Sequence, residues 1–81
     1  MACYAYILWS PSLKRHYAGI AEDLHDRLRR HRRGETRATS GAADWEIVWS
    51  TEAPDYAAAR EVEKRIKARG ASRFLADRGH A

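Results

Sequence analysis

The sequence predicts an α+β fold: a small three-stranded antiparallel sheet flanked by helices, with the element order β-β-α-β-α-α. Three short segments rich in aromatic and apolar residues predict the strands, at 4–9, 16–20 and 45–49. Two longer segments, 23–33 and 56–69, predict helices, because acidic residues lie at or just before their start and a glycine follows each of them.

The first two strands are expected to form a hairpin, because Ser10-Pro11-Ser12 between them favours a turn. A turn centred between Pro11 and Ser12 places Tyr6 directly opposite Tyr17. Side chains alternate between the faces of a strand, so both phenols would project from one face, and a slip of one residue would separate them. The other face would carry apolar core residues: Ala5, Ile7, Trp9, Ala18 and Ile20.

The helix predicted from Asp23 to Arg33 has a charge distribution that matches the helix dipole at both ends. Gly34 follows it and favours its termination. Arg27 and His31 are four residues apart, so they are neighbours along the flank of the apolar stripe. The acidic residues near the start are Glu22, Asp23 and Asp26, and the basic residues near the end are Arg29, Arg30, Arg32 and Arg33.

The second half of the chain is predicted to contain a loop, a strand and two helices. Residues 35–43 are rich in Gly, Thr, Ser and Ala and predict the loop. In the strand that follows, Trp45, Ile47 and Trp49 would share one face. Asp55 is the expected N-cap of the helix at 56–69. Ala58, Val62 and Ile66 would form the buried stripe of that helix, and Phe74 and Leu75 would dock a short last helix at 72–77.

The size and composition of the chain narrow its class. Its 81 residues, 44% hydrophobic and 32% charged, fit one small globular domain spanning residues 1–81. It shows neither an apolar run long enough to span a membrane nor the pattern of a secretory signal, so no membrane association is expected. The lone Cys3 excludes an internal disulfide framework and a multi-cysteine zinc site, and it favours a reducing, cytoplasmic location.

Basic residues are concentrated in one stretch of the chain. The net charge is +4, and six of the twelve arginines lie between Arg27 and Arg37, where Glu35 is the only acidic residue. Guanidinium groups match phosphate oxygens in a bidentate manner, so the cluster favours an anionic partner such as nucleic acid. The alternative is a solvated helix face, which composition alone does not exclude.

Glu63 is the acidic residue whose position is hardest to explain by solvation alone. It lies next to Val62 and four residues beyond Ala59, at the edge of the buried stripe, so its carboxylate must be partly desolvated or paired. Mg²⁺ would be one partner, since it accepts a single carboxylate and completes its shell with water and phosphate oxygens. The alternative is an ion pair with a nearby arginine or with Lys67.

Four other side chains could take part in phosphate chemistry. Tyr6 and Tyr17 could donate or accept a proton or orient a water molecule, or they could be ordinary strand aromatics. Arg27 could hold a phosphate and neutralise its charge, or it could pair with Asp23 or Glu22. His31 could act as an acid or a base, since the intrinsic pKa of histidine lies near neutrality, or it could be a helix-terminal histidine favoured by the dipole. These four residues are separated in the sequence, so only folding of the chain could bring their side chains together.

Taken in order, these residues resemble the motifs of the GIY-YIG nuclease superfamily, especially its short single-domain members, over roughly residues 4–75. The first motif is Tyr4-Ala5-Tyr6-Ile7-Leu8, in which Ala5 stands where the name-giving glycine would be, and the second is Tyr17-Ala18-Gly19-Ile20. The remaining matches are Asp23-Leu24, Arg27-Leu28, His31, Gly34, the strand 45–49, Ala58 and Glu63-Lys64-Arg65-Ile66-Lys67.

The resemblance implies an endonuclease that hydrolyses nucleic-acid phosphodiester bonds with one divalent metal, Mg²⁺ or Mn²⁺, as DNA-repair relatives do. Glu63 would hold the metal, Tyr17 would activate or position water, and Tyr6 would be its partner. Arg27 would hold the scissile phosphate, and His31 would share the acid-base work. Residues expected to grip the nucleic acid are Lys14, Arg15, Arg30, Arg33, Arg37 and Lys67.

The expected substrate is DNA rather than RNA, recognised by its structure or as single strands, because the short chain leaves no room for a module that reads a long sequence. A larger protein partner or a homodimer is possible. Relatives carry an asparagine near the end of the domain, and this chain contains none. The alternative is therefore a nucleic-acid-binding module of the same fold with weak or no catalytic activity.

Overall fold

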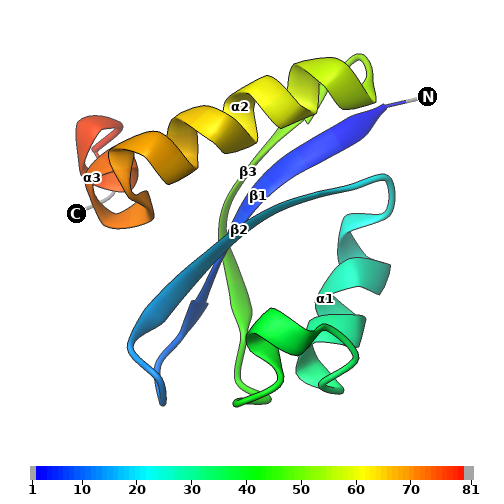
Figure 1. Cartoon of the computed structure of the whole chain (residues 1–81), viewed down its shortest axis with the longest axis vertical. Coiled ribbons are helices and arrows are strands. Elements are labelled where there is room, and N and C mark those ends of the chain that lie inside the picture. Colours follow the sequence, from blue (N-terminus) through cyan, green and yellow to red (C-terminus); the bar gives the residue numbers. More distant parts are fainter. Residues whose placement is uncertain (1, 80–81) are drawn as a thin grey trace.

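The computed structural model describes residues 2–79 and contains a three-stranded antiparallel sheet with helices on both of its faces (Figure 1). The predicted fold class is confirmed. The strand order is β2-β1-β3, so β1 is central and β2 and β3 are edge strands. The elements are β1 (Cys3–Ser10), β2 (Arg15–Ala21), α1 (Leu24–Arg32), the 3₁₀ helix η1 (Arg37–Thr39), β3 (Glu46–Ala53), α2 (Tyr56–Arg69) and α3 (Ala71–Asp77).

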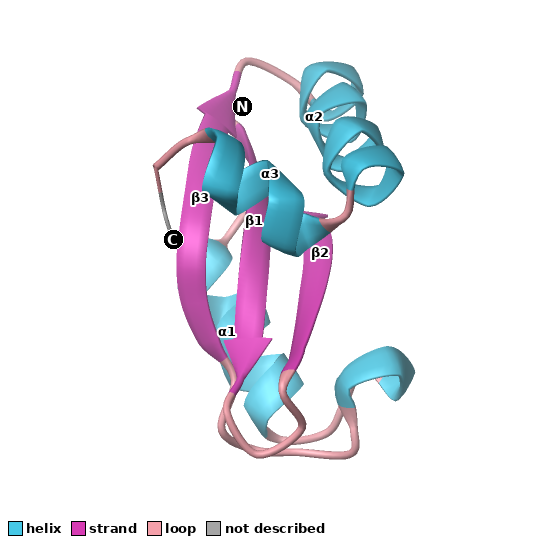
Figure 2. Ribbon diagram, turned by 90° about the vertical axis from the view of Figure 1, so that its left-hand side faces the viewer, coloured by secondary structure: helices cyan, strands magenta, loops and turns pink. Residues whose placement is uncertain are grey.

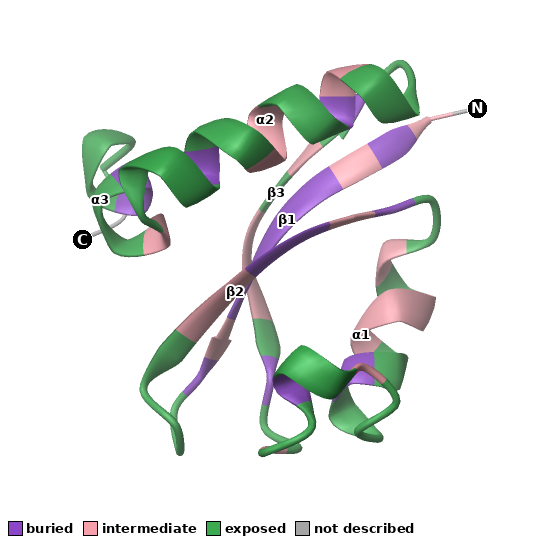
Figure 3. Ribbon diagram, viewed as in Figure 1, coloured by how far each residue is buried: buried purple, intermediate pink, exposed green. Residues whose placement is uncertain are grey.

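The two faces of the sheet are covered by different helices. Figure 2 shows α3 in front of the sheet and α1 behind it, and α2 lies on the side of α3. On the α2/α3 face, Ile7 packs with Ile66 and Phe74. On the α1/η1 face, Tyr6 and Leu8 pack with Trp45, and residues of α1 border this second cluster. The buried residues of β1 therefore serve two cores at once (Figure 3).

The predicted register of the hairpin is wrong by two positions. Tyr6 pairs with Gly19, and Tyr17 pairs with Leu8. The turn is longer than predicted and is centred one residue later, because Lys14 adopts a positive φ of 54° and its amide donates to the Ser10 carbonyl at 2.7 Å. An even shift keeps every side chain on its face, so Tyr6 and Tyr17 still share one.

Asp44 explains why the turn closes in this way. Its carboxylate accepts hydrogen bonds from the Ser10 hydroxyl at 2.6 Å and from the Ser12 amide at 2.8 Å. The hydrogen bond from Ser10 is the main reason that the pKa of the Asp44 carboxyl is lowered. The partner that fixes the turn thus comes from a segment more than 30 residues later, which no local turn rule considers.

The predicted side-chain alternation of the third strand is wrong at Trp49. Ile7 pairs with Trp49 while Leu8 pairs with Ile47, so Val48 is an extra residue in β3 and forms a bulge. Ile47 remains with the cluster on the α1/η1 face, whereas Trp49 packs on the α2/α3 face, with its ring centroid 5.0 Å from that of Phe74. The strand also continues to Ala53, beyond its predicted end.

The helix ends agree closely with the sequence signals. The Asp23 side chain accepts from the amide of Asp26 at 3.0 Å, and the Asp55 side chain accepts from the amide of Ala58 at 2.8 Å. Gly34 has a φ of 75°, a conformation that favours glycine after a helix. In α2 the fully buried residues are Ala59 and Ile66 rather than Ala58.

Among residues 2–79, no helix combines the length and the apolar character that crossing a membrane requires.

Candidate active site

Three of the predicted site residues form a cluster of rings on the α1/η1 face. The ring centroids of Tyr6 and Tyr17 are 6.5 Å apart, and those of Tyr17 and His31 are 5.0 Å apart. The Tyr6 hydroxyl is 2.8 Å from Nε2 of His31. Two strands of the hairpin and one helix therefore bring together side chains that are up to 25 residues apart in the sequence.

Gly19 makes room for this arrangement. A Cβ atom at this position would lie 2.6 Å from the Tyr6 hydroxyl oxygen and 2.7 Å from the adjacent ring carbon, both closer than non-bonded atoms approach. The tyrosine ring thus lies over the bare backbone of its pairing partner in β2. The glycine is required here by the space that Tyr6 occupies.

Behind Tyr6, a chain of hydrogen bonds has a fixed direction. Thr39 Oγ1 lies 2.7 Å from Nδ1 of His31 and 3.3 Å from the carbonyl oxygen of Thr36. The Thr39 hydroxyl has one proton, which it donates to this carbonyl, so its oxygen must accept from the Nδ1–H of His31. In the neutral ring, Nε2 is then the acceptor, and the Tyr6 hydroxyl donates to it.

Burial sets the charge state of this chain. His31 and Thr39 have no exposed surface, and Tyr6 is 1% exposed. Burial raises the pKa of the Tyr6 phenol, and the nearby Tyr17 and Glu63 raise it further, against the opposing effect of Arg27. Burial also lowers the pKa of His31, and Arg27 adds to this decrease. At neutral pH both groups are therefore uncharged, which is the state that the hydrogen-bond direction requires.

The burial of His31 changes the role expected from its sequence position. It is neither a solvated histidine at the end of a helix nor a group that can touch a substrate directly. Its Nε2 contacts Tyr6, and its ring centroid lies 5.0 Å from that of Tyr17 in β2, so it is enclosed by the two tyrosines. Tyr17, in contrast, is only partly buried and remains the accessible phenol of the pair.

Arg27 and Glu63 come from helices on opposite faces of the sheet, yet both of their charges act on the Tyr6 hydroxyl. This is possible because β2 is an edge strand, so side chains from α1 and α2 can approach the same hydroxyl from either side of it. Among residues 2–79, Arg27 has no ion pair with Asp23 or Glu22, the alternative considered from the sequence. The guanidinium is therefore not neutralised by either of these carboxylates, and it acts on the Tyr6 hydroxyl.

For Glu63, the structure shows the ion pair with Lys67 that the sequence offered as the alternative to a metal ion. Its carboxylate is 3.3 Å from Nζ of Lys67, and its side chain is 17% exposed. Lys67 is much more exposed, at 59%, so this ion pair lies at the surface and contributes little to stability. A partly desolvated carboxylate with one exposed cationic partner can exchange that partner for a metal ion.

The donor set fits a hard cation better than zinc. Within the described residues, no group of three or more His, Cys, Asp or Glu side chains is arranged to hold a metal. A site built on Glu63 alone must therefore be completed by water and by oxygens of the substrate. Mg²⁺ tolerates such a shell, since it binds through one or two carboxylates plus phosphate oxygens.

The predicted phosphate-gripping residues are spread over several elements. Lys14 and Arg15 lie at the tip of the β1–β2 hairpin, and Arg37 begins η1; Figure 1 shows these segments at the same end of the molecule. Arg30 is paired with Asp26 at 3.0 Å and Arg33 with Glu35 at 2.6 Å. With Lys67, which is paired with Glu63, three of the six cations are thus engaged in ion pairs.

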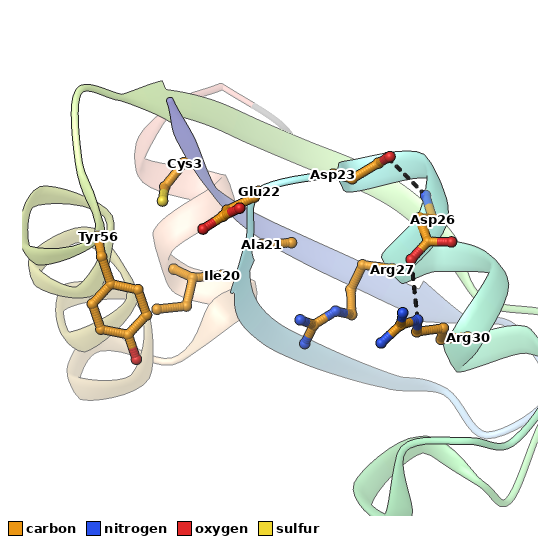
Figure 4. A pocket seen from close by; sticks show the side chains of 9 residues that line it. All are labelled: Cys3, Ile20, Ala21, Glu22, Asp23, Asp26, Arg27, Arg30 and Tyr56. Atoms are coloured by element: carbon orange, nitrogen blue, oxygen red, sulfur yellow. Dashed lines mark hydrogen bonds and ion pairs between the residues drawn. The ribbon is translucent and has the colours of Figure 1, made fainter. Parts of the chain in front are cut away.

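A cavity of about 310 Å³ adjoins the ring cluster through Arg27 (Figure 4). It lies between α1 and α2 along the β2 edge, and no sequence signal predicts it. Arg27 and Arg30 extend into this space from α1, and Tyr56 faces it from the start of α2. The other lining residues are Cys3, Ile20, Ala21, Glu22, Asp23 and Asp26.

Comparison with known families finds a match over most of the chain. The family model of the GIY-YIG catalytic domain matches residues 2–74, nearly the whole chain. The chain therefore belongs to the GIY-YIG family, which assigns it to nucleases and makes nucleic acid its substrate class. No curated protein and no solved structure matches the chain closely enough to name a relative.

Proposed function

We propose that this GIY-YIG protein is a divalent-metal-dependent endonuclease that cleaves DNA at unpaired or structured sites. The observation that supports this proposal most directly is the surroundings of the Tyr6 hydroxyl, on the strand that pairs with the edge strand β2. Arg27 and Glu63 both act electrostatically on the hydroxyl of Tyr6, which packs beside Tyr17. A cation, a carboxylate and two phenols at one place are the groups that phosphodiester hydrolysis needs.

In this proposal Glu63 would hold Mg²⁺ or Mn²⁺ in place of its ion pair with Lys67. The bound cation would stabilise negative charge on the phosphate and on the leaving oxygen. Arg27 binds a non-bridging oxygen of the scissile phosphate and neutralises the charge that develops there. Exposed cations on the hairpin tip and on η1 hold the flanking backbone, so binding weakens as salt concentration rises.

The two tyrosines take different roles because their surroundings differ. Tyr6 is buried, and its hydroxyl donates a hydrogen bond to His31. The phenol therefore stays neutral, and its oxygen can still accept a hydrogen bond. Tyr17 is the accessible phenol and is the group that orients the attacking water or accepts its proton. His31 and Thr39 are positioning residues, since they act through Tyr6.

The test is cleavage of labelled single-stranded, duplex and branched DNA, and of RNA, with and without Mn²⁺ or Mg²⁺. Arg27→Ala and Glu63→Gln should each reduce metal-dependent cleavage by about 100-fold or more, in line with the loss of one transition-state contact. Matched controls are Arg29→Ala and Glu61→Gln, which change exposed residues on the same two helices. Circular dichroism verifies that each variant folds. Undiminished cleavage by either site variant would contradict the proposal.

The second candidate is a nucleic-acid-binding module that retains the fold but does not cleave. It is favoured by the absence of any asparagine from the chain. Its signature would be salt-sensitive binding to DNA with no metal-dependent product on any substrate. The same panel therefore separates the two candidates.

A further inference from the structure

We propose that the cavity between α1 and α2 is a subsite for one unpaired nucleobase of the substrate, and that Tyr56 is the ring on which this base stacks. The proposal rests on the nuclease function above, because it identifies what the site recognises beside the scissile phosphate. The cavity shares Arg27 with the candidate active site, so a nucleotide bound in it is adjacent to the phosphate that Arg27 would hold.

The position of Tyr56 is unusual for a side chain with only a structural role. It is the first residue of α2, and 57% of its surface is exposed, whereas the other large apolar side chains of the described chain, apart from Leu13, are at least partly buried. The start of the helix is stabilised by the Asp55 side chain, which accepts from the Ala58 amide, so the Tyr56 side chain is not needed for capping. In Figure 4 its ring stands beside Ile20 and faces the cavity, so the two form an apolar wall. Such a wall suits an aromatic base, since base–ring stacking is favourable for every base.

The charges around the cavity favour a base over a phosphate. Glu22, Asp23 and Asp26 line it, and within the described part of the chain only Asp26 of the three forms salt bridges, to Arg30 and Arg29. Arg27 and Arg30 bring positive charge into the cavity, but near Glu22 and Asp23 a phosphate would be repelled by the carboxylates. A neutral base would not be, and its N–H edge could donate to the exposed Glu22. The phosphate of the same nucleotide would remain beside Arg27, where the charge is positive.

The size of the space agrees with this occupant. A volume of about 310 Å³ is at the lower end of the range of about 300–1,000 Å³ that is typical of small-molecule sites. A base can enter only if it is unpaired, because in a duplex its faces are covered by neighbouring bases. The subsite would therefore select single strands, flaps or gaps on chemical grounds.

The test measures binding in EDTA, so that it does not depend on cleavage. Fluorescence anisotropy with a short single-stranded DNA should show that Tyr56→Leu weakens binding by about tenfold, whereas Tyr56→Phe binds like the wild type because the ring is kept. Affinity for a duplex should not change. Tyr56 is exposed, so both variants should fold, and circular dichroism checks this.

A set of oligonucleotides, each with one abasic nucleotide, locates the stacked base. The wild type should lose affinity at one position, and at that position Tyr56→Leu should have no further effect. Additive losses at every position, an equal loss on duplex DNA, unchanged binding by Tyr56→Leu, or no measurable binding by the wild type would each overturn the subsite. If binding follows the prediction but no metal supports cleavage, the nuclease proposal fails and the base subsite stands.

Discussion

The two faces of the sheet show two different ways of using burial. On the α2/α3 face, Ile7, Ile66 and Phe74 pack through apolar contacts that have no preferred direction. On the α1/η1 face, the buried residues include His31 and Thr39, whose hydrogen bonds lock each donor and acceptor in one orientation. One face therefore provides stability, while the other holds functional groups in a defined geometry.

The two faces also differ in which substitutions they tolerate. The apolar face needs only the right volume, so similar apolar residues can replace one another there at modest cost. The site face needs particular atoms: a glycine at 19 to admit the Tyr6 ring, a hydroxyl at 39, and a ring nitrogen that faces Tyr6. No buried side-chain polar atom among the described residues lacks a partner, so the chain of hydrogen bonds is complete.

The largest effect on stability is expected from the apolar face. Ile66 has no exposed surface and lies in the centre of the α2/α3 cluster, so Ile66→Ala should lower the free energy of unfolding by about 2–5 kcal/mol. Chemical denaturation measures this loss. The cleavage rate per folded molecule should stay within a few-fold of the wild type, because the buried residues that cluster with Ile66 are not site residues. A loss of activity as large as that of Arg27→Ala would show that the two faces are not separable.

A smaller loss of stability with a larger functional consequence is expected at Thr39. Thr39→Val removes the acceptor of His31 Nδ1–H and leaves a buried donor unpaired, which costs about 1–3 kcal/mol. Without that acceptor the ring can change tautomer, and Tyr6 is no longer fixed as a donor. Nitrogen-15 NMR of the ring should show the Nδ1–H tautomer in the wild type and a mixture in Thr39→Val.

Thr39→Ser is the matched control, because it keeps the hydroxyl. It should restore the single tautomer and most of the kcat lost in Thr39→Val, while KM stays the same in all three proteins. If Thr39→Val retained the pure Nδ1–H tautomer and full activity, the hydroxyl would not be positioning His31.

The smallest predicted effect is a pH dependence that arises from the site face. The pKa of His31 is lowered by burial and by Arg27, so below the ordinary value of about 6.5 the unfolded chain binds a proton that the folded chain does not. The free energy of unfolding should therefore fall as pH decreases from about 6.5, by up to about 1.4 kcal/mol per pH unit.

Denaturation between pH 5 and 7 measures this slope. The comparison uses a His16→Gln background, because burial lowers the pKa of His16 as well. Adding His31→Gln should flatten the slope that remains. A slope that is unchanged by this second substitution would mean that His31 is not the group that resists protonation.

Local signals in the sequence specified the elements well. Asp23 and Asp55 cap their helices as expected, Gly34 ends α1, and α2 begins and ends at the predicted residues. These features depend on contacts between residues at most a few positions apart. The two tyrosines were also correctly assigned to one face, because alternation along a strand survives an even shift in register.

Features that depend on distant partners were mispredicted or missed. The hairpin register follows a turn held by Asp44, and the bulge at Val48 moves Trp49 to the other face. Thr39 lay in a segment expected to be loop, and nothing local indicated that its hydroxyl would meet His31. No local signal predicted a role for Tyr56, the first residue of a helix, because the cavity beside it forms only when α1 and α2 are both in place.

The sequence by itself determined which residue types are present, where helices and strands form, and the order of the family motifs. Only the tertiary structure decided that His31 is a buried acceptor, that Tyr6 is its donor, and that Tyr17 remains accessible. The physical reason is that capping and alternation arise from neighbours in the chain. The protonation state and accessibility of a side chain arise instead from the groups that pack around it, and those come from every part of the fold.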